Sequence, residues 1–158
     1  VIGFDFDNTL EKYNKMIGIM YLLRIDGLFP ASVKHKIYPE VPEVLSELKK
    51  RYPLALISKT RILPPELKEK RIRESPIAQY FSRIYVVEKK DMATYRDLLE
   101  RVKHDIGNFD EFVYVGNDLE EDYRIPDRIG IKSILVDRAD RHNVERKIRN
   151  LQEVEKFL

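Results

Sequence analysis

The fold is decided by residues 1–10, which read Val1-Ile2-Gly3-Phe4-Asp5-Phe6-Asp7-Asn8-Thr9-Leu10. A short apolar run of this kind is typical of a buried strand. Asn8 and Thr9 supply turn and capping groups just beyond it. Because open α/β sheets place their chemistry at the carboxyl ends of strands, Asp5 and Asp7 predict a nucleophile or a metal site there.

The rest of the chain alternates between apolar runs and helical patterns. Four more runs predict strands at residues 54–57, 84–87, 112–116 and 131–136. Helices are predicted over residues 41–52, 66–74 and 91–106, in a short segment closed by Gly130, and after Asn143 as an N-cap. The last helix would carry Val144, Ile148, Leu151 and Val154 on one face. This alternation predicts an α/β, three-layer Rossmann-like fold with a five-stranded parallel sheet.

Length and composition limit the classes of protein. With 158 residues, 43% of them hydrophobic, the chain is expected to form a single domain over residues 1–158. The absence of cysteine excludes disulfides and thiol catalysis, and it suits the cytoplasm, which is the expected location. A high charged fraction, 35%, without Cys or Trp favours a thermophilic source.

Charge and hydropathy also exclude some partners. The 29 basic and 27 acidic residues nearly balance, so no nucleic-acid partner is expected. The longest apolar run, residues 16–23, is too short to span a bilayer, so no membrane partner is expected either. The oligomeric state is left open between a monomer and a homodimer.

Polar residues follow two more of the predicted strands. Ser58 ends the strand at 54–57, and its hydroxyl, together with the backbone N–H of Lys59, can bind a phosphate oxygen. The strand at 112–116 is followed by Asn117, Asp118 and Asp122. Carboxylate and amide oxygens are ligands that Mg²⁺ prefers. The sequence therefore predicts phosphate and magnesium chemistry at one edge of the sheet.

These motifs resemble those of the haloacid dehalogenase (HAD) superfamily of phosphotransferases. Asp5 to Thr9 resembles its Asp-x-Asp-x-Thr motif, Ser58 its second motif, and residues 115–122 its strand-Gly-Asp-x-x-x-x-Asp motif. Residues 37–45 resemble the segment that enters the first crossover helix in the magnesium-dependent phosphatase branch. Residues 11–36 have no such counterpart, and they stand where relatives carry a cap. Since the segment is short, a small cap or flap, partly helical, is expected.

The resemblance implies a role for each residue of the motifs. Asp5 would be the nucleophile and Asp7 the general acid and base. Asp5 and the backbone carbonyl of Asp7 would also bind Mg²⁺. Asn117 stands where most members have a metal-binding Asp, which leaves open whether Asn117, Asp118 or Asp122 is the direct ligand.

The third motif is a lysine that neutralises the nucleophile and the phosphoryl oxygens. Lys89 and Lys90 are both candidates. Lys90 lies five residues before Tyr95, which matches one variety of the motif, whereas another variety would select Lys89. We choose Lys90 as the catalytic and phosphate-binding lysine.

The expected function is that of a magnesium-dependent phosphatase. It would hydrolyse phosphomonoesters, of small molecules or phosphoproteins, through an aspartyl-phosphate. Asp7 speaks against a dehalogenase, since a departing halide needs no proton. The alternatives are a phosphotransferase or phosphomutase, and a catalytically inactive HAD-like interaction module. His35, His104 and His142 fall in none of the motifs and are expected at the surface.

Overall fold

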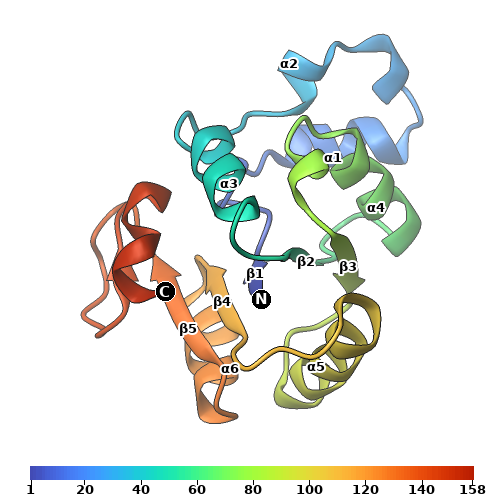
Figure 1. The fold of residues 1–158 in the computed structure, drawn as a ribbon. Helices are drawn as coiled ribbons and strands as arrows, with labels where there is room; N and C mark the ends of the chain where they lie inside the picture. The colour runs from blue at the N-terminus through green and yellow to red at the C-terminus, as the bar shows by residue number, and fades with distance from the viewer.

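The computed structural model describes residues 1–158 and contains one parallel sheet of six strands in the order β3-β2-β1-β4-β5-β6 (Figure 1). The strands are β1 (Ile2–Phe4), β2 (Leu54–Lys59), β3 (Arg83–Val87), β4 (Val113–Gly116), β5 (Lys132–Val136) and β6 (Lys147–Ile148). In the register of the sheet, Phe4 lies opposite Leu56 on one side and Val115 on the other. The predicted parallel α/β sheet is thus confirmed.

The strand order reverses between β1 and β4. From β1 the chain builds outward through β2 to β3, and it then returns to the other side of β1 and builds outward through β4 and β5. In α/β sheets the crevice for a ligand lies at such a switch point, outside the carboxyl ends of the strands. The loops after Phe4 and Gly116 flank this crevice.

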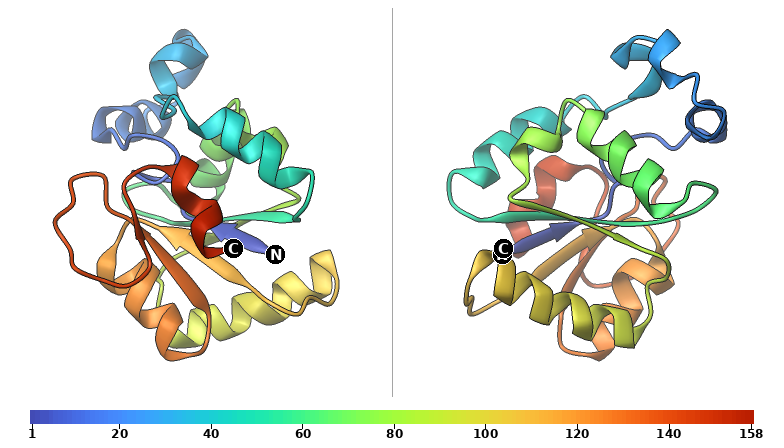
Figure 2. Two further views of the ribbon diagram at one scale, coloured as in Figure 1. Left: turned by 60° about the vertical axis from the view of Figure 1, so that its left-hand side comes forward. Right: turned by 90° about the vertical axis from the view of Figure 1, so that its right-hand side faces the viewer.

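Helices cover both faces of the sheet (Figure 2). One face carries α3 (Val41–Lys49) and α4 (Pro65–Glu74), and the other carries α5 (Met92–Ile106) and α6 (Ile125–Arg128). Right-handed crossovers on the two sides of the switch point place the helices on opposite faces in this way. Two hydrophobic clusters result, of 18 and 10 buried residues, one on each face of the sheet.

Helix α5 shows how local sequence fixes a functional position. Its N-cap is Asp91, whose side chain accepts a hydrogen bond from the Thr94 N–H at 2.8 Å. Tyr95, Leu98 and Val102 recur at helical spacing and are buried against the sheet. The helix therefore begins directly after Lys90 and holds this residue at the carboxyl edge.

The prediction of five strands is wrong, because a sixth strand occupies part of the predicted last helix. Lys147 and Ile148 pair with Leu135 and Val136 of β5 and so extend the sheet. A 3₁₀ helix, Leu151–Phe157, begins only after Asn150, which replaces Asn143 as the cap. The apolar residues of the predicted face are nonetheless buried at three positions, which are Ile148, Leu151 and Val154.

The insertion at residues 11–36 contains two short helices, α1 (Lys15–Leu22) and α2 (Ala31–Lys34), and contacts α4. Its Tyr21 hydroxyl donates to Glu74, and its Asp26 pairs with Lys70 at 2.7 Å. Tyr21 also belongs to a cluster of only three buried residues, with Ile17 and Leu63. The insertion therefore depends on α4 for its packing.

No helix of the protein is both long and apolar enough to cross a membrane.

Candidate active site

Asp5 directly follows β1 and is almost completely buried at the switch point. Its Oδ1 accepts a hydrogen bond from the Lys90 ammonium at 2.6 Å, and its Oδ2 lies 3.1 Å from the Thr9 hydroxyl. Burial raises the pKa of Asp5 to about 6, since the Lys90 ammonium only partly offsets burial and the nearby carboxylates. At neutral pH the carboxylate is therefore ionised and shielded from bulk water.

Lys90 lies between two carboxylates. Its ammonium donates to Asp5 and, at 2.7 Å, to Asp122 Oδ1. Burial lowers the pKa of Lys90, but the Asp122 and Asp5 carboxylates outweigh burial and raise the pKa well above its usual value. The side chain of Lys89 is 73% exposed and pairs with Asp91 instead. The structure thus brings Lys90, and not Lys89, to Asp5.

Asp122 fixes the loop after β4. Its Oδ2 accepts hydrogen bonds from the backbone N–H groups of Asn117 and Asp118 at 3.1 and 3.0 Å. A Cβ atom at position 116 would lie 2.5 Å from the Asp122 side chain, so only glycine allows this approach. Asp122 therefore positions both this loop and Lys90.

The Asp118 side chain makes no contact with Asp5. It is exposed, and its Oδ1 accepts hydrogen bonds from the N–H groups of Glu120 and Glu121 at 3.0 and 2.8 Å. It thereby caps the π-helical turn Leu119–Arg124. Of the three candidate metal ligands in this motif, Asn117 is the one whose side-chain oxygen contacts the same Thr9 hydroxyl as Asp5 does.

The oxygens around Asp5 fit a hard cation. The Asn117 amide oxygen lies 3.2 Å from the Thr9 hydroxyl, which also contacts Asp5. The Asp7 carbonyl oxygen accepts no backbone hydrogen bond. No group of three or more His, Cys, Asp or Glu side chains forms a metal cluster. One carboxylate, one amide and one carbonyl oxygen still suit Mg²⁺, which keeps several waters.

Asp7 is held by two cations that the sequence analysis did not single out. Lys68 and Arg71, both from α4, donate to Oδ2 and Oδ1, the Arg71 contact measuring 3.0 Å. A third cation, Arg61, lies 3.7 Å from Oδ2. The side chains of Asp7, Lys68 and Arg71 are 3%, 2% and 2% exposed. Asp7 thus forms a buried double ion pair.

These contacts decide the charge of Asp7. Burial raises the pKa of its carboxyl, but Lys68 and Arg71 outweigh burial and lower the pKa below its usual value. Asp7 is therefore ionised at neutral pH. In this state it can accept a proton from water, but it carries no proton to give to a leaving group.

The ion pairs continue from Asp7 into the insertion. Arg71 also donates to Glu11, and Glu11 Oε2 lies 2.9 Å from His35 Nδ1. His35 is 5% exposed, so the expectation of a surface histidine is wrong at this position. Glu11 is fully buried, and it needs the polar partners that Arg71, His35 and Ser75 supply. The predicted surface position does hold for His104, which is exposed.

Ser58 is the penultimate residue of β2 and is buried, and its hydroxyl has no hydrogen-bond partner. An unpaired buried hydroxyl costs about 1–3 kcal/mol. The ammonium of Lys59 pairs with Glu121 at 2.6 Å and does not reach Asp5. Phosphate binding by Ser58 and the Lys59 backbone N–H stays a prediction.

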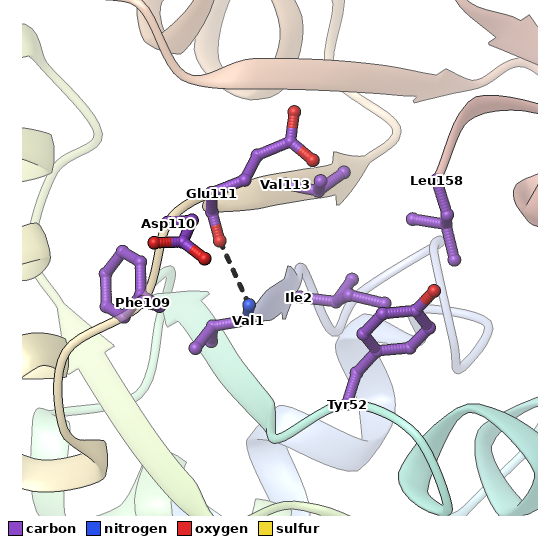
Figure 3. Close-up of a pocket in the computed structure, with 8 residues that line it drawn as sticks. All are labelled: Val1, Ile2, Tyr52, Phe109, Asp110, Glu111, Val113 and Leu158. Atoms are coloured by element: carbon purple, nitrogen blue, oxygen red, sulfur yellow. Dashed lines mark hydrogen bonds between the residues drawn. The ribbon is translucent and has the colours of Figure 1, made fainter.

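A hollow lies at the amino ends of the strands, beside the two chain ends (Figure 3). Six of its eight lining residues are hydrophobic, and the Val1 ammonium donates to the Glu111 carbonyl at 3.0 Å. None of the motif residues contributes to it. The motif residues therefore gather at the carboxyl ends of the strands, away from this hollow.

Comparisons with known proteins show which solved structures share this fold. No family model matches the sequence, and no curated protein sequence matches it. Among solved structures, the HAD phosphatase of Thermococcus onnurineus is 17% identical, with a TM-score of 0.71 over 98% of this chain and 95% of that one. The HAD hydrolase YfnB of Bacillus subtilis, bound to magnesium, is 15% identical, with a TM-score of 0.73 over 98% and 96%.

A 2-haloacid dehalogenase of Pseudomonas syringae is similar in the same way, at 16% identity and a TM-score of 0.66 over 99% of this chain and 96% of that one. Phosphatases and dehalogenases thus share this architecture, and the architecture does not choose between them. What the likeness establishes is that the chain has the fold of HAD-superfamily hydrolases.

Proposed function

We propose that the protein is a magnesium-dependent phosphatase that hydrolyses phosphomonoesters through a phosphorylated Asp5. The observation that carries the proposal is the buried Asp5 carboxylate, paired with Lys90 at the switch point of the sheet. The unpartnered hydroxyl of Ser58 supports it, because a phosphate oxygen would supply the missing partner.

The reaction proceeds in two displacements at phosphorus. In the first, an oxygen of Asp5 forms a bond to phosphorus while the bond to the ester oxygen breaks, and the electron pair leaves with this oxygen as an alkoxide. In the second, water attacks phosphorus, inorganic phosphate departs and the Asp5 carboxylate is restored. Lys90 offsets the repulsion between the anionic carboxylate and the phosphoryl oxygens.

The remaining residues assist both steps. Asp5, Asn117 and the Asp7 carbonyl would hold Mg²⁺, which when bound offsets the charge of the phosphoryl oxygens. Ionised Asp7 takes the proton of the attacking water in the second step. In the first step it must acquire a proton before it can protonate an alkoxide. Leaving groups that depart as stable anions therefore suit the site best, and 4-nitrophenyl phosphate should be hydrolysed faster than alkyl phosphates.

One observation favours a different class of function. Both oxygens of Asp7 are bonded to cations, and a carboxylate held in this way is what an inactive, ligand-binding module of the same fold would retain. A phosphotransferase would use the same residues as a phosphatase, and no contact in the structure favours it. Turnover and its products decide between these classes.

The test is hydrolysis of 4-nitrophenyl phosphate with MgCl₂ and with EDTA, by the unaltered protein, Asp5→Asn and Asp110→Asn. Asp110 is an exposed carboxylate at the amino ends of the strands, and it serves as the matched control. We expect release of inorganic phosphate that requires Mg²⁺ and Asp5 but not Asp110, and a phosphoryl adduct on Asp5 by mass spectrometry. Equal rates for Asp5→Asn and the unaltered protein would refute the proposal.

A further inference from the structure

Arg61 is the exposed member of the three cations around Asp7. It follows β2 by two residues, and its Nε lies 3.7 Å from Asp7 Oδ2. Its side chain is 46% exposed, whereas those of Lys68 and Arg71 are 2% exposed. Of the three cations, Arg61 is therefore the one most open to a substrate that enters from solvent.

The buried ion pairs do not need Arg61. Lys68 and Arg71 both donate to Asp7, and Arg71 also donates to Glu11. Two cations thus match two carboxylates before Arg61 is counted. Asp7 is the only ionic contact of Arg61, and 3.7 Å is too long for a hydrogen bond. The N–H groups of Arg61 are therefore left to water or to a ligand.

Tyr13 holds the Arg61 guanidinium without using these donors. The guanidinium carbon lies over the Tyr13 ring, 5.0 Å from its centre, which is within the range of a cation–π contact. The backbone N–H of Tyr13 donates to Asn8 Oδ1 at 3.0 Å, so this part of the insertion is tied to the turn after Asp7. The ring supplies no oxygen to accept the N–H groups of Arg61. Arg61 is thus held in place with its donors available.

The position of Arg61 is the one where the leaving group must pass. A residue that protonates the departing oxygen has to come within about 2.6–3.2 Å of it, so in the proposed reaction this oxygen lies beside Asp7. Both oxygens of Asp7 already accept hydrogen bonds from cations of α4. The charge that develops on the departing oxygen therefore needs a further donor, and Arg61 lies against the same carboxylate.

We propose that Arg61 is a catalytic residue that donates a hydrogen bond to the ester oxygen as this oxygen departs in the first displacement. The inference rests on the proposed phosphatase function and adds a residue to it. An oxygen of Asp5 forms its bond to phosphorus, the bond from phosphorus to the ester oxygen breaks, and the electron pair stays on the ester oxygen. Arg61 keeps its own proton and stabilises this charge until a proton from water reaches the oxygen, directly or through Asp7.

The test compares two substrates that differ in the leaving group. Values of kcat/KM are measured with MgCl₂ for phenyl phosphate and 4-nitrophenyl phosphate. Phenolate keeps more of its charge on oxygen than 4-nitrophenolate does, so it depends more on a donor. Because kcat/KM refers to free enzyme and substrate, slow hydrolysis of the aspartyl-phosphate does not mask the first step.

The proteins are the unaltered chain, Arg61→Ala, Arg61→Lys and the control Arg101→Ala. Arg101 is a matched control, since its side chain is 49% exposed and its guanidinium lies over the Tyr85 ring at 5.1 Å. It lies in α5 and contacts none of the motif residues. Melting temperatures, measured on each variant, confirm that it is folded.

We expect Arg61→Ala to lower kcat/KM by about 10²-fold or more for phenyl phosphate and by no more than about tenfold for 4-nitrophenyl phosphate. Arg61→Lys should keep part of the activity on phenyl phosphate because it keeps a charged donor, and Arg101→Ala should change neither substrate. If Arg61 only held Asp7 in place, both substrates would slow by the same factor. Equal factors, or no loss in Arg61→Ala, would overturn the inference and leave the proposed function intact. If the unaltered protein hydrolyses neither ester, the proposed function falls and this inference falls with it.

Discussion

The double ion pair on Asp7 makes a strong prediction about stability. Lys68→Met removes one cation from a buried carboxylate and keeps most of the apolar stem, so little cavity is created. Breaking a buried pair by removing one partner costs about 3–5 kcal/mol. Because Arg71 still bonds the other oxygen and Arg61 lies 3.7 Å away, we expect the lower end, a loss of about 3 kcal/mol at pH 7.

The sign of the pH dependence follows from the pKa of Asp7. Its pKa in the folded protein is lowered from 3.8, so the ion pairs stabilise the fold above that value. Their contribution is lost as the pH falls through the lower, folded pKa. The difference in the free energy of unfolding between the unaltered protein and Lys68→Met should therefore be full at pH 7 and shrink below about pH 4.

Urea unfolding, monitored by circular dichroism, measures this difference in the free energy of unfolding at pH 7 and below about pH 4. Lys103→Met is the control, since Lys103 is a helical lysine whose pair with Glu100 is exposed, and its loss should cost less than about 1 kcal/mol. A double-mutant cycle that combines Lys68→Met with Asp7→Asn measures the coupling free energy between Asp7 and Lys68. A loss for Lys68→Met no larger than for Lys103→Met, or one that does not change with pH, would refute the reasoning.

Three further predictions concern the catalytic residues. Lys90→Ala should lower kcat for 4-nitrophenyl phosphate by about 10²–10³-fold and Lys89→Ala by less than about threefold, and the reverse order would move the motif by one residue. Asp7→Asn should slow turnover by about 10²–10⁴-fold with little change in the Mg²⁺ concentration needed for half activity, and a complete loss of metal response would contradict the division of roles. Gly116→Ala should push Asp122 away and lower both kcat and the melting temperature, whereas a fully active, equally stable variant would show that the loop can shift freely.

Three of the candidate residues that the sequence analysis singled out share one property. Asp5 and Asn117 directly follow buried strands and Ser58 is the penultimate residue of one, and the carboxyl ends of parallel strands lie at a common edge of the sheet. Local pattern is then enough to bring residues together that are far apart in the chain. The position of Lys90 could also be predicted from local sequence, because the N-cap at Asp91 fixes where the helix after it begins.

Lys68 and Arg71 could not be found by the same rule. They lie in the middle of α4, in a segment so rich in charge that a solvated face is the ordinary expectation. One signal was present: Lys68, Arg71, Ile72 and Ser75 recur at the spacing of a single helical face, and all four are buried. That this face turns toward Asp7 and Glu11 depends on how α4 packs over the end of β1, which is tertiary information.

The strand β6 was missed because a strand of two residues is too short to show the alternation of apolar and polar residues that identifies a strand.

Two carboxylates separated by one residue therefore have opposite electrostatic environments. The pKa of Asp5 is raised to about 6 and that of Asp7 is lowered, although a nucleophile is needed ionised and a general acid protonated. A cation bound at Asp5 would lower its pKa and favour the nucleophile. At Asp7, a phosphate that draws Lys68 or Arg71 toward its own oxygens would weaken the ion pairs and let the pKa rise. Binding of the substrate, rather than the resting geometry of the site, is then what prepares Asp7 to protonate a leaving group.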